Sequence, residues 1–343
     1  MGALEVYVLS VGEGDSAIIK TPLGNVIVID AYKWDKVKHV LDKIAPKPHG
    51  GTERVVSHLI VTHPHTDHYS AAGNVLSRYT VRKVTLAPFW YRLEEQLMLG
   101  GPQYKNCINK VLEERIPLRF LGGYQRSYPD VGQRQGDEQY DPYNLPNEVC
   151  LELLGPPNDL LEELEEAQEK NKGIKILEPN HLSIMARLSH EQFSMVFAAD
   201  AQMENWAHYD RAGMLEKGCK VLKAAHHGSM NGTQWERLHR LEPKMVIVSS
   251  KRHGKHNLPD LIGSTTFWKY ERTYGKGKVA LTETTGTIKI TISDPAKGTF
   301  DSECYLDQPG AKTIPWEDPQ DPLPFTDWAQ IAHDRWKEQA NEP

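Results

Sequence analysis

The stretch "VTHPHTDHYS" (residues 61–70) contains four potential metal ligands directly after the apolar run of residues 57–62. These candidate ligands are His63, His65, Asp67 and His68. Burying four such groups at the end of a strand would leave polar atoms unsatisfied unless something binds there. Neutral imidazoles and a carboxylate suit borderline divalent ions such as zinc, and also manganese or iron. The stretch therefore predicts a metal site, whereas a set of solvated loop histidines is the alternative.

Two further clusters of ligand types stand at later strand ends. Asp200 ends the run "FSMVFAAD", and His226 and His227 follow the run "CKVLKAA". A lone aspartate at a strand end is often only a turn or helix cap. Three such clusters are instead expected to meet at one sheet edge, where a carboxylate could bridge two metal ions.

The composition excludes several classes of protein. Of the 343 residues 39% are hydrophobic and 25% charged, and no apolar run approaches the roughly 20 residues that span a bilayer. The start "MGALEVYVLSVGEGDS" lacks the pattern of a secretion signal, and the four cysteines form no C-x-x-C pair. We expect a cytoplasmic protein with reduced thiols and no membrane association. The net charge of -6 argues against a surface that coats long nucleic acid, although a local basic patch is compatible with it.

The order of apolar patterns predicts one domain over residues 1–300. Strands are expected over residues 4–10, 16–20, 25–30, 57–62, 81–87, 148–155, 183–188, 193–199, 219–225 and 245–250. Helices are expected over residues 34–44, 69–79, 158–171 and 204–215. Residues 88–147 lack any period and predict a long loop insertion beside the site. Residues 301–343 are rich in Pro and Asp and predict a tail on the surface, and either segment could recruit a protein partner.

These motifs resemble those of the metallo-β-lactamase superfamily. More narrowly, "LSVGEGDSAII", "VTHPHTDH", "NHLSIMARL", "FAAD" and "LKAAHHGS" occur in the order found in the soluble hydrolase domain of the competence proteins that process incoming DNA. The match runs over about residues 4–292. The resemblance implies an α/β fold, the αββα sandwich of two mixed sheets, with two divalent metal ions at one edge, zinc first and manganese as the alternative.

Carried over residue by residue, the resemblance implies a set of ligands. His63 and His65 would bind one metal, Asp67 and His68 the other, Asp200 would lie between them, and His226 would complete the second site. Asn180 stands where most of the superfamily has another histidine, which leaves the metal of the first site open. His181 is an alternative ligand, but the spacing from Asn180 to Ser183 fits the family pattern better.

Residues around the metals follow the same logic. Asp30, at the end of "NVIVID", resembles the aspartate that orients a ligating histidine, and a plain strand-end cap is its alternative. The turn "VGEGDS" would bring Asp15 near the metals, unless it is a simple hairpin turn. The loop "KRHGKH" would supply cations for a substrate or be a solvated basic loop. The residues expected to bind substrate are Lys251, Arg252, Lys255 and Ser229.

The resemblance implies a metal-dependent hydrolase that acts through a metal-activated hydroxide. Asp67 would orient the attacking water, and His227 or His256 would protonate the leaving oxygen. The favoured reaction is that of a phosphodiesterase or nuclease on DNA or a nucleotide. Hydrolysis of a carboxylic ester, lactone or phosphocholine-type ester is the first alternative, since fold alone does not choose among them. A metal-bound regulatory or binding module is the second. The chain has no channel segment, so a role in DNA uptake does not transfer.

Overall fold

Apolar residues at successive positions give the inner strands two buried faces. In strand β1 (Leu4–Val8), Val6 faces one core cluster and Tyr7 faces another, and strand β3 (Val26–Ile29) alternates in the same way. Because successive side chains of a strand point to opposite faces, a strand buried on both faces must lie between two layers. The computed structural model describes residues 2–48, 51–87, 101–127, 129–130, 149–157, 161–162, 166, 179–251 and 258–305.

Two large sheets carry most of these strands. The first sheet runs in the order β17 (Thr299–Tyr305), β16 (Thr287–Asp294), β1, β2 (Ala17–Lys20), β3, β5 (His58–Val61), β7 (Val84–Leu86) and β8 (Leu118–Phe120). The second runs in the order β15 (Val279–Leu281), β14 (Met245–Val248), β13 (Val221–Lys223), β12 (Phe193–Phe197), β11 (Met185–His190), β10 (Val149–Leu154) and β9 (Tyr124–Ser127). Strands β4 (Val55–Val56) and β6 (Thr80–Val81) form a small separate sheet.

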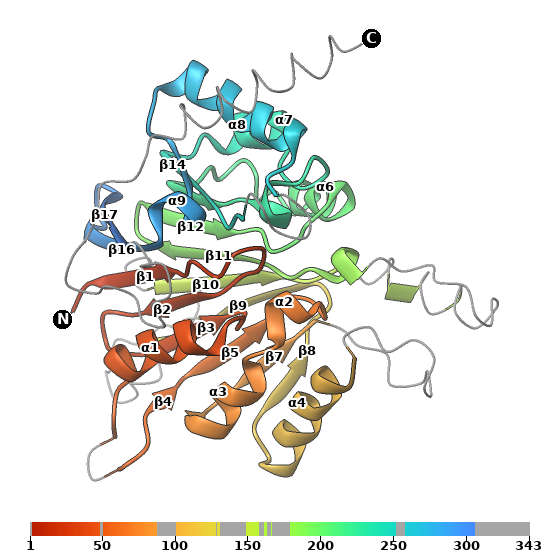
Figure 1. The fold of residues 1–343 in the computed structure, drawn as a ribbon, viewed down its shortest axis with the longest axis vertical. Helices are drawn as coiled ribbons and strands as arrows, with labels where there is room; N and C mark the ends of the chain where they lie inside the picture. Colours follow the sequence, from red (N-terminus) through yellow and green to blue (C-terminus); the bar gives the residue numbers. More distant parts are fainter. Residues whose placement is uncertain are drawn as a thin grey trace.

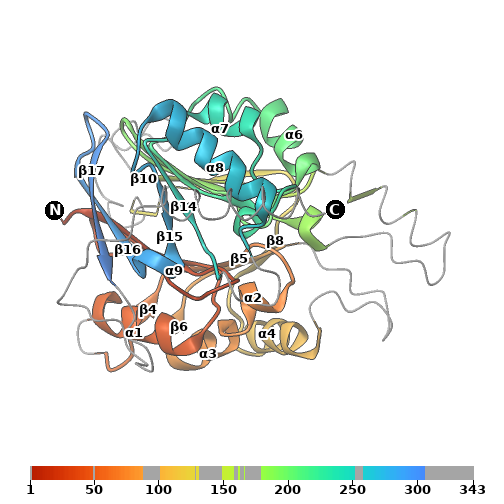
Figure 2. The ribbon, with the colours of Figure 1, turned by 45° about the horizontal axis from the view of Figure 1, so that its top comes forward.

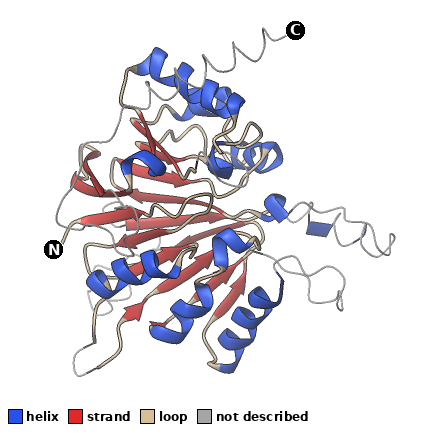
Figure 3. Ribbon diagram, in the orientation of Figure 1, coloured by secondary structure: helices blue, strands red, loops and turns tan. Residues whose placement is uncertain are grey.

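Helices cover the outer faces of both sheets (Figures 1 and 3). On the first sheet lie α1 (Trp34–Ile44), α2 (Thr66–Tyr69), α3 (Ala72–Arg78) and α4 (Gly101–Glu113). On the second lie α6 (Met203–Arg211), α7 (Trp235–Leu241) and α8 (Leu261–Tyr274), while α9 (Thr282–Thr285) lies beside β15 and β16. One apolar cluster fills the space between the sheets, and one lies under each helix layer. The predicted αββα sandwich of two mixed sheets is confirmed.

Each sheet is parallel in one half and antiparallel in the other. In the first sheet β3, β5, β7 and β8 run parallel, and in the second β12, β13, β14 and β15 do so. Carboxyl ends of parallel neighbours lie at the same edge of a sheet, and Figure 2 shows the two sheets packed face to face, with donor residues from both of them within 4.8 Å of one another. The ends of β3 and β5 therefore come close to the ends of β12 and β13.

Helix α1 shows how closely pattern and structure agree. It covers the predicted range of residues 34–44, and its buried face contains Val37, Val40 and Leu41, which are spaced for one side of a helix. The predicted helix over residues 69–79 is instead two short helices, α2 and α3, separated by Ser70 and Ala71. The split places Asp67 and His68 inside α2.

The predicted loop over residues 88–147 is wrong for its described central part. Helix α4 buries Tyr104, Ile108 and Val111 on one face against the first sheet's helix layer. Strand β8 adds to the edge of the first sheet and β9 to the edge of the second. These edge strands expose Phe120 and Tyr124, so the sequence does not alternate as an inner strand would.

The expected start of the tail at residue 301 falls inside β17, which continues to Tyr305. Residues 306–343 and most of the predicted acidic helix over residues 158–171 lie outside the described residues. Among the described residues, no helix is both long and apolar enough to cross a membrane.

Candidate metal centre

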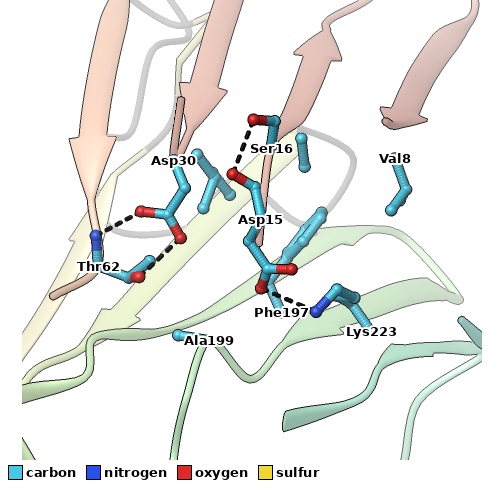
Figure 4. Close-up of a pocket in the computed structure, with 10 residues that line it drawn as sticks. Val8, Asp15, Ser16, Asp30, Thr62, Phe197, Ala199 and Lys223 are labelled. Carbon is cyan, nitrogen blue, oxygen red and sulfur yellow. Dashed lines mark hydrogen bonds and ion pairs between the residues drawn. The ribbon is translucent and has the colours of Figure 1, made fainter. Parts of the chain in front are cut away.

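The ends of β3 and β5 build the floor of the site. Asp30 follows β3, and its carboxylate accepts hydrogen bonds from the Thr62 backbone N–H (2.8 Å) and hydroxyl (2.7 Å). His68 Nδ1 lies 2.8 Å from Asp30 Oδ2, in a fully buried pair. A carboxylate on Nδ1 fixes the ring and leaves Nε2 to face a metal ion. Figure 4 shows Asp30 pointing toward Thr62.

The first group of donors contains His63, His65 and Asp200, which offer atoms within 4.8 Å of one another. His63 Nε2 lies 3.4 Å from Asp200 Oδ2 and 3.2 Å from His65 Nδ1. The two histidines come from the loop after β5 and the aspartate from the loop after β12, so the group joins the two sheets.

The second group contains Asp67, His68, Asp200 and His227, again within 4.8 Å of one another. Asp200 Oδ1 lies 3.3 Å from His68 Nε2 and 3.4 Å from His227 Nε2. Asp67 Oδ2 lies 3.4 Å from the same nitrogen of His227. Asp200 therefore presents one carboxylate oxygen to each group, which is the geometry of a bridging ligand.

The structure brings His227, and not the expected His226, into the second group. His226 Nε2 is 3.9 Å from Asp200 Oδ2 and 3.4 Å from the Asn180 side-chain nitrogen, and its Nδ1 lies 3.1 Å from Asn231 Oδ1. His226 thus lies next to the first group but belongs to neither, and Asn180 lies beside His226. His181, the alternative to Asn180, faces Glu204 instead, at 3.4 Å.

Backbone conformation explains which histidine faces the donors. His226, His227 and Gly228 have consecutive positive φ values of 48, 52 and 82°, within the short 3-10 turn η3 (Ala225–Gly228). A left-handed run turns each side chain away from the direction that a continuing strand would give it. Gly228 has no room for a side chain, because a Cβ would lie 2.7 Å from Pro259 Cβ.

The turn of residues 11–16 reaches the site through Gly14 and Asp15. The Asp15 N–H donates to the Asp67 carbonyl oxygen at 3.1 Å. A Cβ on Gly14 would lie 2.3 Å from the Tyr32 ring and 2.8 Å from that same carbonyl, so only glycine permits the approach. Asp15 Oδ1 lies 3.6 Å from His227 Nδ1, and Oδ2 accepts from Lys223 Nζ at 2.8 Å.

Neighbouring charges strongly shift the pKa values of residues in the second group. Burial alone would lower the pKa of His68, but Asp200 and Asp30 outweigh it and hold that pKa well above its ordinary value. Burial would raise the pKa of Asp200, yet His227 and His68 hold it well below the ordinary range. For Asp67, the close contact with His227 and the charge of His68 likewise outweigh burial and lower the pKa. The carboxylates are ionised at neutral pH, as metal ligands must be.

In the first group, burial and the neighbouring His68 lower the pKa of His63. Burial and then His63 lower the pKa of His65 to about 4. Both imidazoles are therefore neutral at pH 7, which is the form that binds a metal ion.

Several buried donor atoms fit a metal ion and lack another partner. His68 Nε2, Asp200 Oδ1 and His227 Nε2 make no hydrogen bond within the described part of the chain. Buried polar atoms are normally satisfied, so unsatisfied nitrogen and oxygen atoms that converge on one point indicate a ligand. Nitrogen and carboxylate donors in this mixture are typical of a binuclear site for zinc or a similar ion.

A cavity of about 480 Å3 opens onto these groups, and its wall includes Glu13, Asp67, His226, Ser229 and Leu258. Its volume is that of a small-molecule site. Lys251 pairs with Leu258 across the base of the "KRHGKH" loop and packs against Gly12. Lys251 and Ser229 thus lie at or beside the cavity, whereas Arg252, Lys255 and His256 lie outside the described residues.

The model of the family described as "Metallo-beta-lactamase superfamily" matches residues 9–250. The chain belongs to this superfamily. A comparison with curated proteins found no match. Nothing in the comparisons bears on the narrower resemblance to the competence proteins.

Several solved structures are similar to this member of the superfamily. The crystal structure of CmlA, a diiron beta-hydroxylase from Streptomyces venezuelae, is 13% identical, with 81% of this chain and 52% of that chain covered and a TM-score of 0.46. Zn(2+)-bound PqqB from Methylobacterium extorquens is 8% identical, with 81% and 97% covered and a TM-score of 0.48. A diphosphatase from the PhnP family is 10% identical, with 81% and 94% covered and a TM-score of 0.40. The chain spans about half the length of CmlA.

Two residues at the candidate metal centre were not predicted from the sequence. Glu13 lies on the cavity wall, within the glycine turn that was considered only for Asp15. Lys223 is buried beside Asp15. A lysine on the inner face of the strand "VLK", next to two histidines, was the available signal, because lysine is seldom buried without a partner.

Proposed function

We propose that this protein is a metal-dependent hydrolase that works with two divalent ions held at the edge of the sandwich. The observation that carries the proposal is Asp200, which offers Oδ2 to His63 and Oδ1 to His68 and His227. A carboxylate placed between two groups of imidazoles and carboxylates supports a pair of ions and not one. Zinc is the expected metal and manganese the alternative.

We assign the ligands accordingly. His63, His65 and Asp200 would hold one ion, with Asn180 close by, and Asp67, His68, Asp200 and His227 the other. His226 would line the substrate cavity, where its side chain is 22% exposed. His227 is only 3% exposed and enclosed by carboxylates, so it is poorly placed to protonate a leaving group.

When bound, two such ions supply an activated water at neutral pH and stabilise negative charge that develops on the substrate. Asp67 and Asp200 both line the cavity, but Asp67 is 30% exposed and Asp200 only 2%, so Asp67 is the carboxylate placed to orient the attacking water. Asp200 is buried and serves as the bridge alone. Ser229 and His226 also line the cavity, where a substrate would contact them.

A phosphodiester is the substrate we favour, within DNA or a nucleotide. Support comes from the ordered motifs that resemble the hydrolase domain of the competence proteins, and from Lys251 at the base of a loop with further cations. A carboxylic ester, lactone or phosphocholine-type ester is the alternative, since the same metal centre could cleave it. A metal-bound regulatory or binding module is the non-enzymatic alternative, and the nearly complete donor set favours an enzyme over it.

Metal analysis followed by substrate screening tests the proposal. We expect two equivalents of metal per chain and hydrolysis of bis-p-nitrophenyl phosphate and of single- or double-stranded DNA. Asp42→Asn, which changes a carboxylate paired with Lys38 outside every donor group, is the control and should behave as wild type. Cleavage of a lactone panel alone would favour the first alternative. Two bound metals without turnover on any substrate would favour the binding module, and no bound metal would refute the proposal.

A further inference from the structure

A buried ion pair joins the two sheets next to the second donor group. Lys223 belongs to β13 of the second sheet and donates to Asp15 Oδ2 at 2.8 Å, and Asp15 precedes β2 of the first sheet. The two side chains are 4% and 8% exposed. Figure 4 shows them pointing at each other across the space between the sheets.

Little solvent reaches this pair. A cavity of about 10 Å3 beside it is lined by apolar side chains, among them Val8 and Phe197, and by the polar residues Ser16, Asp30 and Thr62. A buried ion pair in such surroundings gains little net stability, because the cost of desolvating both charges offsets their attraction. Stability alone is therefore a weak reason for placing a lysine and an aspartate here.

The free oxygen of the pair points to the metal centre. Among the residues that the structure describes, Asp15 Oδ1 has no hydrogen-bond partner and lies 3.6 Å from His227 Nδ1, which also has none. On the opposite side of the same group, Asp30 occupies the equivalent place behind His68, with 2.8 Å between Oδ2 and Nδ1. Asp15 and Asp30 thus stand behind the two histidines of the second group, each on the nitrogen that faces away from Asp200.

We propose that Lys223 is a positioning residue, which holds Asp15 so that its carboxylate accepts the Nδ1–H of His227 and leaves Nε2 free for the metal. The inference rests on the proposed function, in which His227 is a ligand of the second ion. An outer carboxylate of this kind fixes the tautomer and the ring orientation of a ligating histidine.

Backbone contacts fix the pair at both ends. Lys223 Nζ also donates to the Ala224 carbonyl oxygen at 3.0 Å, at the start of the turn that carries His227. The Asp15 N–H donates to the Asp67 carbonyl oxygen at 3.1 Å. One ion pair therefore links the chain segments of two ligands, His227 and Asp67.

Lys223 can be tested with metal affinity and with the state of the His227 ring. Lys223→Met leaves Asp15 without its anchor, and Asp15→Leu with Lys223→Met removes the acceptor and leaves no buried charge unpaired. Both variants should bind the second equivalent of zinc about 10–100-fold more weakly than wild type in competition with a chromophoric chelator. Long-range 1H–15N spectra of the zinc-loaded wild type should show His227 protonated at Nδ1, assigned with His227→Gln, and the double variant should lose this signal.

Two comparisons separate positioning from mere structural support. Asp15→Asn with Lys223→Met keeps an acceptor oxygen, so it should recover part of the affinity that the leucine variant loses at equal thermal stability. Glu152→Gln disturbs another buried charge on the second sheet, whose carboxylate contacts Arg187 at 3.9 Å, and should leave zinc affinity unchanged.

Wild-type affinity for the second zinc ion in Lys223→Met, or an unchanged His227 signal in the double variant, would overturn the inference and leave the proposed function standing. A wild-type protein that binds no second ion would overturn both.

Discussion

Asp67→Ala should abolish hydrolysis and leave the fold almost intact, because the structure separates the chemical and structural roles of Asp67. Its carboxylate lies 3.4 Å from His227 and 3.8 Å from His68, and 30% of the side chain is exposed. A partly exposed ion pair contributes about 0–1 kcal/mol, and an acid in the first turn of a helix about 0.3–1 kcal/mol. The repulsion between Asp67 and Asp200 offsets part of this. The Asp67 carbonyl still accepts from Asp15 in the variant.

The expected destabilisation is therefore about 1 kcal/mol, or a fall in Tm of about 1–2 °C for a chain of this length. Turnover loses a metal ligand and the group that orients water, and should fall by at least about 10³-fold, which corresponds to about 4 kcal/mol. The assay is kcat/KM on the best phosphodiester at saturating zinc, with Tm measured in parallel.

Asp35→Ala is the matched control, since Asp35 is an exposed acid in the first turn of α1, in the same helix layer. It should keep wild-type turnover and lose a similar, small amount of stability. If Asp67→Ala retained wild-type turnover on every substrate that the parent cleaves, the two-metal mechanism would have to be abandoned. A loss of activity explained by global unfolding would contradict the separation of roles.

Buried His58, 2.8 Å from the Thr85 hydroxyl, has a pKa lowered to about 3 by burial and then by a nearby lysine. An unfolded histidine titrates near about 6.5, so the metal-free protein should lose stability as pH falls from there toward 3, and urea unfolding of His58→Gln should show a flatter dependence. Replacing Lys251, Arg252 and Lys255 with alanine should raise KM for a phosphodiester and flatten its salt dependence, with little effect on a neutral lactone. Unchanged salt dependence would identify the loop as a solvated turn.

The sequence predicts best those helices whose apolar residues recur on one face and those strands that are buried on both faces. Helix α1 has one clear apolar face and is predicted to its ends, and strands such as β3 and β12 differ from prediction only at their termini. Helix α4 was not predicted, although Tyr104, Ile108 and Val111 have helical spacing. The sequence on either side of it shows no regular apolar pattern, so the whole of residues 88–147 was assigned to a loop. Edge strands β8 and β9 carry few buried residues and so give little signal.

The candidate ligands could be predicted from their residue types, but which ligand belongs to which donor group could not. His226 and His227 are neighbours with the same chemistry, and the sequence offers no basis for choosing between them. Their positive φ values, the contact of the His226 N–H with the Ala199 carbonyl at 2.8 Å, and the lack of room at Gly228 decide which ring faces Asp200. Such features depend on segments far apart in the chain.

Both donor groups combine residues from the two sheets. The first sheet supplies His63 and His65 through the loop after β5 and Asp67 and His68 through helix α2, and the second supplies Asp200 and His227 through the segments after β12 and β13. Because Asp200 contributes to both groups, a shift of one sheet against the other would disturb both ions together. The Lys223–Asp15 pair crosses the same gap, and it limits such a shift at the point where His227 must stay in place. The rigidity of the interface between the sheets is thus a condition for the geometry of the metal centre.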